Sequence, residues 1–177
     1  MSQLDEIRSQ FEACSDHAGR LLTGSVPERL TRRPASGGWS AAQCVAHLTV
    51  TNQHYFLMLR DALAQAPSGD GPYKMDMRGR LLRWILEPPY RSRVKTIPSM
   101  EPAAGEDPAK VLAAFLAGQQ ELASILDAAR GKALGSVQIT SPFNRRMKYN
   151  AYSCFVVLAA HERRHLWQAE QVLRALP

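Results

Sequence analysis

The sequence predicts an all-α protein, a four-helix bundle with one long crossover connection between helices two and three. Four stretches of the chain repeat apolar residues every three or four positions, as in helices that pack one face against a core. A proline-rich stretch, residues 66–107, separates the second of these from the third. The length of 177 residues suits one domain spanning 1–177.

The first stretch predicts a helix over residues 3–22. Its apolar residues form one stripe, made of Leu4, Ile7, Phe11, Cys14, Ala18 and Leu21. His17 stands one position off this stripe, so we expect it at the boundary between the core and solvent. A loop follows, which contains Pro27, Pro34, Gly37 and Gly38.

The second stretch begins with the segment GGWSAAQCVAHL. Ser40 and Gln43 have the spacing of a capping box, in which each side chain satisfies a free backbone amide at the start of a helix. Trp39 stands just before the cap, in the position of a hydrophobic staple. We therefore expect the second helix to run from near Ser40 to about Ala64, with His47 two turns in.

The stretch 66–107 has a different character. It holds scattered glycines and six prolines: Pro67, Pro72, Pro88, Pro89, Pro98 and Pro102. Only residues 77–87 could form a short helix, which Pro88 would stop. Long connections of this kind often shape binding sites, so we expect the crossover to border one.

The third and fourth stretches complete the bundle. Asp107 and Pro108 form a helix start, with the first residue as the N-cap and the second at the first helical position. Gly131 is a natural stop for this third helix. Residues 137–140 predict one extended segment, and the fourth helix should begin around Asn150.

The composition favours a cytoplasmic protein. The N-terminal segment has acidic residues among its first six and lacks the apolar region of a secretory signal. No stretch approaches the roughly 18 consecutive apolar residues of a membrane span. Cys14, Cys44 and Cys154 are widely spaced within apolar helical patterns, which favours reduced, buried thiols over disulfides. We therefore expect a cytoplasmic protein with no membrane partner.

The net charge of +6 comes with small groups of arginines. These groups are Arg32 with Arg33, the arginines of 78–83, Arg91 with Arg93, Arg145 with Arg146, and Arg163 with Arg164. No helix-turn-helix, zinc finger or RNP motif stands beside them, so we do not expect nucleic acid as a partner. A basic surface can instead steer an anionic small molecule. We expect a small-molecule substrate and leave a homodimer open.

The segment HERRH, residues 161–165, matches H-E-x-x-H, the signature of zinc proteases. His161 and His165 continue the apolar stripe of the fourth helix, so both rings should face the bundle interior. A single inward histidine is more often a hydrogen-bonded core residue than a ligand. Two at this spacing would each need polar partners, and a divalent cation shared by neutral imidazoles removes that difficulty.

A metal site needs a further ligand, and His47 on the second helix is the best candidate. His54 is the competitor because it faces the same way, but it lies about 10 Å further along the helix axis. The two rings therefore cannot readily bind one ion. We expect His47 to be the ligand and His54 to be a polar residue in or near the cleft.

Two motifs, GGWSAAQCVAHL and HERRHLWQ, resemble in order and spacing those of the DinB/YfiT-like family of small bacterial metalloproteins. The resemblance covers nearly the whole chain, including the crossover. It implies a four-helix bundle in which His47, His161 and His165 bind a divalent metal such as zinc or nickel, with water in the open positions. Members of the family include transferases that use low-molecular-weight thiols such as bacillithiol or mycothiol, and a thiol-dependent isomerase. Many other members have no known activity.

Three neutral histidines with open coordination positions are typical of catalytic sites, because structural zinc usually has four protein ligands. We therefore expect a metal-dependent enzyme acting on small molecules, either a thiol S-transferase or a hydrolase. Its cofactors would be a divalent metal and, for the transferase, a low-molecular-weight thiol. The alternative is a non-catalytic bundle that binds a metal or a ligand. A pocket lined by the crossover would favour the enzyme, whereas a fourth protein ligand or an apolar plug would favour the alternative.

Glu162 would be the general base if the motif belonged to a zinc protease, but we expect the match to be coincidental. Only twelve residues follow His165, too few for the usual downstream ligand, and Gln168 stands where the metzincin extension requires glycine. On a helix Glu162 projects roughly 80° from the midpoint of the two histidines. We therefore expect it to flank the site or to form a salt bridge outside it.

Overall fold

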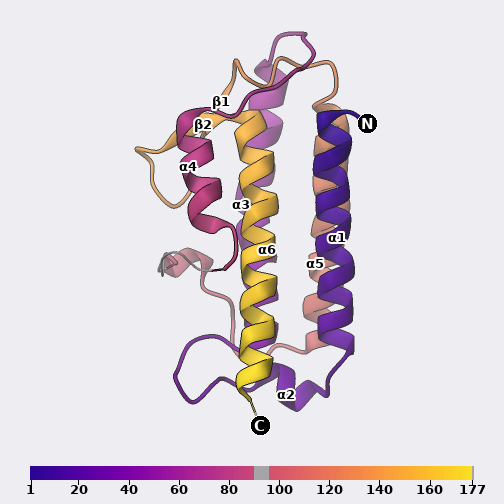
Figure 1. Cartoon of the computed structure of the whole chain (residues 1–177), viewed down its shortest axis with the longest axis vertical. Coiled ribbons are helices and arrows are strands. Elements are labelled where there is room, and N and C mark those ends of the chain that lie inside the picture. Colours follow the sequence, from indigo (N-terminus) through magenta and orange to yellow (C-terminus); the bar gives the residue numbers. More distant parts are fainter. Residues whose placement is uncertain (90–95, 177) are drawn as a thin grey trace.

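The computed structural model describes residues 1–89 and 96–176, and within these ranges the protein is mainly helical. Its four long helices are α1 (Gln3–Thr23), α3 (Ala41–Gln65), α5 (Pro108–Ala128) and α6 (Ala151–Ala175). They lie side by side as a four-helix bundle (Figure 1). The predicted all-α fold is therefore confirmed.

The directions of the helices explain why the chain needs a crossover. α1 and α6 run one way along the bundle, and α3 and α5 run the other way (Figure 1). Both α5 and α6 contact α1 and α3, so they lie on opposite sides of that pair. Because α3 and α5 are parallel neighbours, the chain must return along the length of the bundle between them.

The long helices begin where their capping residues predict. The Ser40 hydroxyl accepts a hydrogen bond from the Gln43 amide, and the Gln43 side chain accepts one from the Ser40 amide, each at 3.2 Å. The side chains of Asp107 and Asn150 likewise accept hydrogen bonds from backbone amides in the first turns of α5 and α6. The predicted helix starts are therefore confirmed.

Sequence reasoning missed three short elements. α2 (Pro27–Thr31) lies within the loop expected after α1, and the 3-10 helix η1 (Pro98–Met100) lies within the crossover. The extended segment predicted at 137–140 is β1 (Gln138–Thr140), and it pairs antiparallel with the unpredicted β2 (Lys148–Asn150). Elements of three to five residues are too short to show a hydrophobic period.

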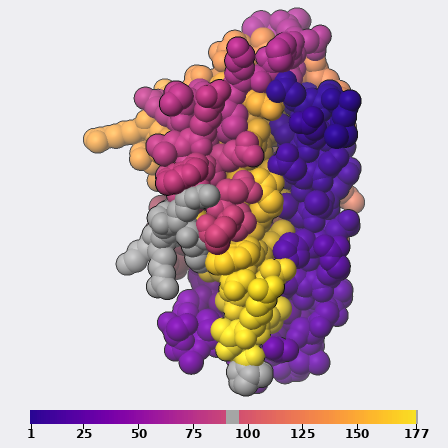
Figure 2. All heavy atoms as spheres, viewed as in Figure 1, coloured from indigo at the N-terminus to yellow at the C-terminus, as the bar shows by residue number. Residues whose placement is uncertain are grey.

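The short helix predicted within the crossover is α4 (Met77–Leu86). Figure 2 shows it lying directly against α6. The approach is close because Gly79 faces Ser153, and a Cβ atom at Gly79 would lie only 2.4 Å from that serine side chain. Near the other end of α4, the Glu87 carboxylate pairs with the Arg163 guanidinium at 2.7 Å. These contacts hold α4, which is part of the crossover, against α6.

A polar layer divides the bundle core into two apolar regions. One region joins the N-terminal halves of α1 and α6 to the C-terminal halves of α3 and α5, and the other joins the opposite halves. Between them lie Asn52 of α3, Gln119 of α5 and Glu162 of α6, all buried. The side-chain amides of Asn52 and Gln119 both donate hydrogen bonds to Oε1 of Glu162, whereas the remaining side-chain oxygen of each of the three residues is buried without a partner in the described part of the chain.

Other predictions concern single side chains. Cys14, Cys44 and Cys154 are buried and free, as expected. His17 lies at the edge of the core, half-buried, with its Nε2 atom 2.8 Å from the Glu170 carboxylate. No helix in the described part of the chain is both long and apolar enough to cross a membrane.

Candidate metal centre

His47 of α3 meets His161 and His165 of α6 inside the protein. The three ring centroids are 4.6–5.3 Å apart, and one ring nitrogen of each histidine lies within 4.8 Å of the other two. Their exposed fractions are only 1%, 7% and 8%. The structure thus brings together the three residues predicted as ligands, and the cluster is compatible with metal binding.

The two helices hold these rings in different ways. His161 and His165 are one turn apart on α6, so their side chains lie next to each other. His47 lies two turns into α3, and its Nδ1 atom donates a 2.8 Å hydrogen bond to the carbonyl oxygen of Met100 in η1. Because a carbonyl oxygen only accepts, Nδ1 carries the proton and Nε2 keeps its lone pair. The Thr51 hydroxyl lies 3.3 Å from this Nε2 atom.

Burial keeps the three imidazoles neutral. It lowers the pKa of His47 below 6.5, against the hydrogen bond to Met100, which acts in the other direction. Burial also lowers the pKa values of His161 and His165 well below 6.5, assisted by charge repulsion from neighbouring histidines and from Arg164. Neutral imidazole is the form that binds metal ions.

The hydrogen bonding of the pair on α6 also fits a cation. The Nδ1 atoms of His161 and His165 are buried without a hydrogen-bond partner among residues 1–89 and 96–176. A buried polar atom left unsatisfied costs about 1–3 kcal/mol. Nitrogen donors of this type suit zinc, nickel and similar divalent ions.

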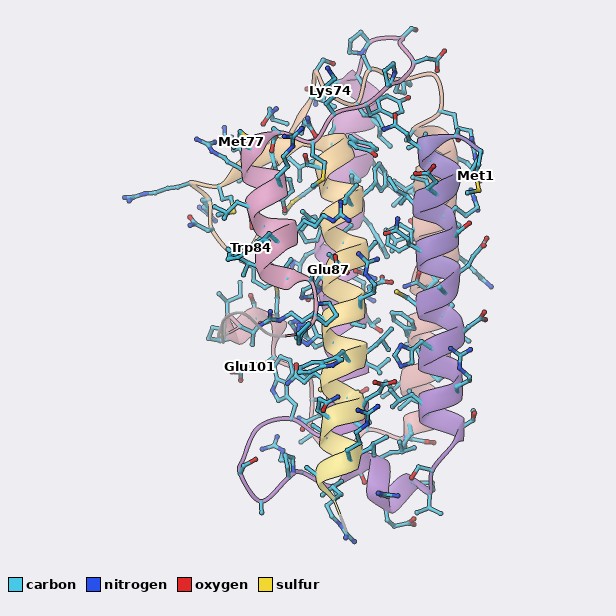
Figure 3. All side chains as sticks on the ribbon, in the orientation of Figure 1. Met1, Lys74, Met77, Trp84, Glu87 and Glu101 are labelled. Atoms are coloured by element: carbon cyan, nitrogen blue, oxygen red, sulfur yellow. The ribbon has the colours of Figure 1, made fainter. Side chains whose placement is uncertain are left out.

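The histidines line a pocket of about 870 Å³, which is a typical size for a small-molecule site. Its wall is mostly apolar and comes from α3, the loop before α3, α6, the crossover and the loop between β1 and β2. The crossover contributes Leu82, Ile85, Leu86, Thr96, Ile97 and Glu101. Glu101 of the crossover is labelled in Figure 3. The crossover therefore borders the pocket, as predicted.

No fourth histidine, cysteine, aspartate or glutamate joins the cluster within the described ranges. Trp39 lies close to the cluster, with its ring centroid 4.7 Å from that of His47 and 5.9 Å from that of His165. The sequence analysis did not predict that Trp39 would lie beside the histidines and assigned it only to a hydrophobic staple. The signal available was the position of an aromatic residue directly before the helix that carries a candidate ligand.

The part of the chain that carries the three histidines matches a known protein family. The DinB superfamily matches the chain over residues 10–169, a range that includes all three clustered histidines. The chain belongs to the DinB superfamily. No curated protein and no solved structure matches it. The predicted resemblance to DinB-like proteins is therefore confirmed.

In this DinB-superfamily protein, Glu162 lies in the polar layer and does not line the pocket. Its Oε1 atom accepts hydrogen bonds from the Asn52 amide at 2.8 Å and the Gln119 amide at 2.7 Å. Burial raises the pKa of Glu162 to about 7, although these hydrogen bonds act in the other direction. A general base must reach the reacting group, so this carboxylate cannot serve the pocket as a protease base.

The alternative in which Glu162 forms a salt bridge outside the site is therefore wrong, since its hydrogen-bond partners are the buried amides of Asn52 and Gln119. The reason is that α1, α3 and α4 all pack against α6. A helix covered on several sides has little solvent-facing surface at its middle, so a residue about 80° from the histidines is still inside the protein. The side chain is completely buried there, at 0% exposure.

The expectation for His54 is also wrong, because its side chain is exposed and does not line the pocket. The pocket-facing residues of α3 are His47, Thr51 and Tyr55, which follow a spacing of four. At about 100° per residue each step of four turns the stripe by about 40°, so at Tyr55 it lies about 80° from the direction of His47. Position 54 points about 20° to the other side of that direction, roughly 100° from Tyr55, and so it leaves the pocket.

The predicted arginine groups occupy different places in the DinB bundle. Arg145 and Arg146 are exposed in the loop between β1 and β2 and do not line the pocket. Arg91 and Arg93 lie outside the described residues. The arginine that lines the pocket in the described part of the chain is Arg164, which is buried.

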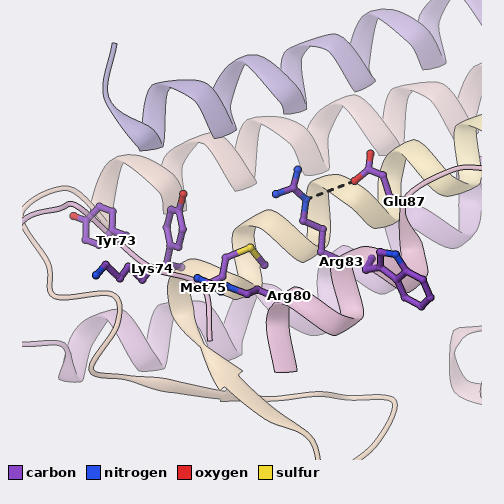
Figure 4. A pocket seen from close by; sticks show the side chains of 8 residues that line it. Tyr73, Lys74, Met75, Arg80, Arg83 and Glu87 are labelled. Carbon is purple, nitrogen blue, oxygen red and sulfur yellow. Dashed lines mark ion pairs between the residues drawn. The ribbon is translucent and has the colours of Figure 1, made fainter. Parts of the chain in front are cut away.

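Arg80 and Arg83 of the 78–83 segment line a separate hollow of about 560 Å³ (Figure 4). It is lined by Tyr73, Lys74, Met75, Arg80, Arg83, Trp84, Glu87 and Tyr152. None of the clustered histidines is among these residues. Arg83 pairs with Glu87 at 3.8 Å within the same helix end. This surface is therefore distinct from the candidate metal centre.

Proposed function

We propose that this protein is a metal-dependent enzyme acting on small molecules, of the thiol S-transferase or hydrolase type. His47, His161 and His165 would bind one divalent cation such as zinc or nickel. The observation that carries the proposal is the meeting of three buried imidazoles in the wall of a large pocket, with no fourth candidate ligand in the described ranges. Three protein ligands leave positions for a substrate, which is the pattern of catalytic sites.

The residues around the histidines support catalysis in distinct ways. The hydrogen bond to Met100 fixes the orientation and tautomer of His47, as outer partners of metal-ligating histidines usually do. The apolar pocket wall limits the access of bulk water to a bound substrate. When bound, a divalent cation supplies Lewis acidity, which lowers the pKa of a coordinating thiol or water molecule. In the transferase form of the proposal, a low-molecular-weight thiol is the second substrate.

The cysteines and the pocket volume bear on the location of the protein and on the size of its substrate. Three free, buried cysteines suit a reducing compartment, so we infer a cytoplasmic protein. The pocket volume suits a small-molecule substrate.

Metal analysis combined with a thiol panel tests the proposal. We expect purified protein to hold one divalent ion per chain. A transferase should join thiols to 1-chloro-2,4-dinitrobenzene only when metal and thiol are both present, whereas a hydrolase should cleave p-nitrophenyl esters without thiol. His161→Ala should lose both metal and turnover, and His54→Ala, on the exposed side of α3, should keep both. Metal-loaded protein that turns over neither substrate class would contradict the enzyme and favour a non-catalytic binding bundle.

A further inference from the structure

A cluster of three buried hydroxyl groups borders the histidine pocket. The phenol oxygens of Tyr55 in α3 and Tyr149 in β2 share a hydrogen bond of 2.7 Å. The side chain of Ser141, the residue directly after β1, is within hydrogen-bonding reach of both phenols. All three residues are at most 3% exposed. Tyr55 and Ser141 line the pocket, whereas Tyr149 does not.

The hydroxyl cluster and the histidines lie at different places along the pocket. Tyr55 is eight residues after His47, so their backbones are about 12 Å apart along the axis of α3. Phe143 connects the two places on the opposite wall. Its ring centroid is 6.2 Å from that of His161, and its backbone amide donates a 3.3 Å hydrogen bond to the Oγ atom of Ser141. One cavity therefore contains two separate groups of polar side chains.

The pocket wall on the side of the hydroxyl cluster is apolar. Val157 and Leu158 line the pocket and precede His161 on α6. Because α3 and α6 run in opposite directions, these two residues lie on the same side of the histidines as Tyr55 (Figure 1). Leu82 of α4 and Phe143 also line the pocket. Hydroxyl groups within such a wall can orient a ligand whose body is hydrocarbon.

The chemistry of the hydroxyl cluster suits an uncharged ligand group. Burial raises the pKa values of both phenols, so they keep their protons at neutral pH. The charged residues of the described pocket lining are Arg164 and Glu101, which directly precede His165 and follow Met100 in the sequence, at the histidine end. A hydroxyl group has one proton, two lone pairs and a free torsion. Three hydroxyls can therefore satisfy one another and still accept a hydrogen bond from a ligand hydroxyl.

We propose that the cluster of Tyr55, Tyr149 and Ser141 is a second subsite, which binds a hydroxyl group at the far end of an elongated apolar substrate whose reacting group faces the three histidines. The inference rests on the proposed function, since it names the substrate class of the same pocket. A ligand hydroxyl buried without a partner is unfavourable, so the pocket would select the position of this group along the ligand. Tyr55 is then a specificity-determining residue.

Ligands of graded length test the inference. The probes are straight-chain alkyl hydroxamates that end in a hydroxyl group, each compared with the methyl-terminated hydroxamate of the same length. Hydroxamates chelate divalent metal ions, so the full chain is loaded with Co²⁺ to anchor the probes at the histidines. The Co²⁺ content is measured separately, the Co²⁺ absorption spectrum reports the anchoring, and calorimetric titration gives the affinities.

The terminal preference should reverse with probe length. We expect the methyl-terminated probe to bind more tightly at short lengths, because a hydroxyl group would then be buried against the apolar wall. At the length that reaches the cluster, the hydroxyl-terminated probe should bind about fivefold more tightly, as expected for one added hydrogen bond.

Three variants make the test specific. Tyr55→Phe removes only one oxygen from the pocket lining and should abolish the reversal, so that the methyl terminus is preferred at every length. Tyr149→Phe is the matched control, because it removes the oxygen outside the lining, and it should keep the reversal. Ser141→Ala removes the other lining hydroxyl and should lower the preference below about threefold. This variant decides the matter if Tyr55→Phe does not fold.

The outcomes separate this inference from the proposed function. A wild-type protein that binds Co²⁺ and the probes but prefers the methyl terminus at every length would overturn the inference and leave the metal site standing. A full reversal that survives in both Tyr55→Phe and Ser141→Ala would overturn it as well. A chain that binds no Co²⁺ would contradict the proposed function and this inference together.

Discussion

The Nδ1 atom of His47 donates a 2.8 Å hydrogen bond to the carbonyl oxygen of Met100, and this contact joins α3 to the crossover. The crossover therefore contributes directly to the candidate site. It fixes the tautomer of the one clustered histidine that lies outside the HERRH segment. Loss of such an outer partner commonly lowers metal affinity by about 10- to 100-fold.

Loosening η1 should therefore weaken metal binding. Pro98→Gly adds backbone freedom at the start of η1, two residues before the carbonyl that holds His47. We expect metal affinity to fall by up to about fivefold, corresponding to an ordering cost of up to about 1 kcal/mol. Competition with a chelator of known affinity measures the change. Pro67→Gly, at an exposed position near the start of the crossover, is the matched control and should leave the affinity unchanged.

Glu162→Gln should retain metal and most of the activity. The carboxylate lies in the polar layer outside the pocket, so it cannot take a proton from a substrate there. We expect a change of at most severalfold in turnover under saturating thiol or ester, whereas loss of a general base costs about a hundredfold or more. A hundredfold loss against peptide substrates, with metal still bound, would restore the zinc-protease interpretation.

The same substitution should change how stability depends on pH. Burial raises the pKa of Glu162 to about 7 from a reference value of 4.5, so the folded protein binds a proton more tightly than the unfolded chain. The resulting stability is fully present below pH 4.5 and is lost as pH rises to about 7. The free energy of unfolding of wild type should therefore fall relative to Glu162→Gln by on the order of 3 kcal/mol across this interval. Urea unfolding of metal-free protein measures it, and a pH-independent difference would contradict the burial of an ionisable carboxyl.

A pair of glycine substitutions tests the seating of α4 on α6. Gly79→Ala would place a Cβ atom 2.4 Å from the buried Ser153 side chain, so the two helices must separate. Overpacking of this kind typically costs about 1–3 kcal/mol in the free energy of unfolding. Gly19→Ala, on α1 with nothing within 4 Å of the added atom, should instead stabilise by up to about 1 kcal/mol. Equal effects in thermal unfolding would show that the α4 contact is looser than described.

Local signals made the helices predictable. The capping box of Ser40 and Gln43 and the N-cap at Asp107 each act within a few residues, so a linear sequence contains all the information they need. The register they set placed His47 correctly relative to the helix start. The partner strand β2 was not predictable, because strand pairing depends on a contact that a three-residue segment does not encode.

The clustering of His47, His161 and His165 was predictable, but the surroundings of these residues were not. His161 and His165 share a face of one helix, so their adjacency follows from helical spacing alone. The positions of Trp39, Glu162 and Arg164 depend on which neighbours cover each side of α3 and α6. Helical periodicity gives a direction around one axis and does not say whether a pocket, a polar layer or solvent lies in that direction.

The central claim is that His47, His161 and His165 together bind one divalent ion. Elemental analysis of purified wild type and five alanine variants tests it most directly. We predict one ion per chain in wild type, in His17→Ala and in His54→Ala, because the first of these histidines pairs with Glu170 and the second is exposed. His47→Ala, His161→Ala and His165→Ala should each fall to near zero. Full occupancy in His161→Ala, or metal lost from His54→Ala and kept by His47→Ala, would contradict the account.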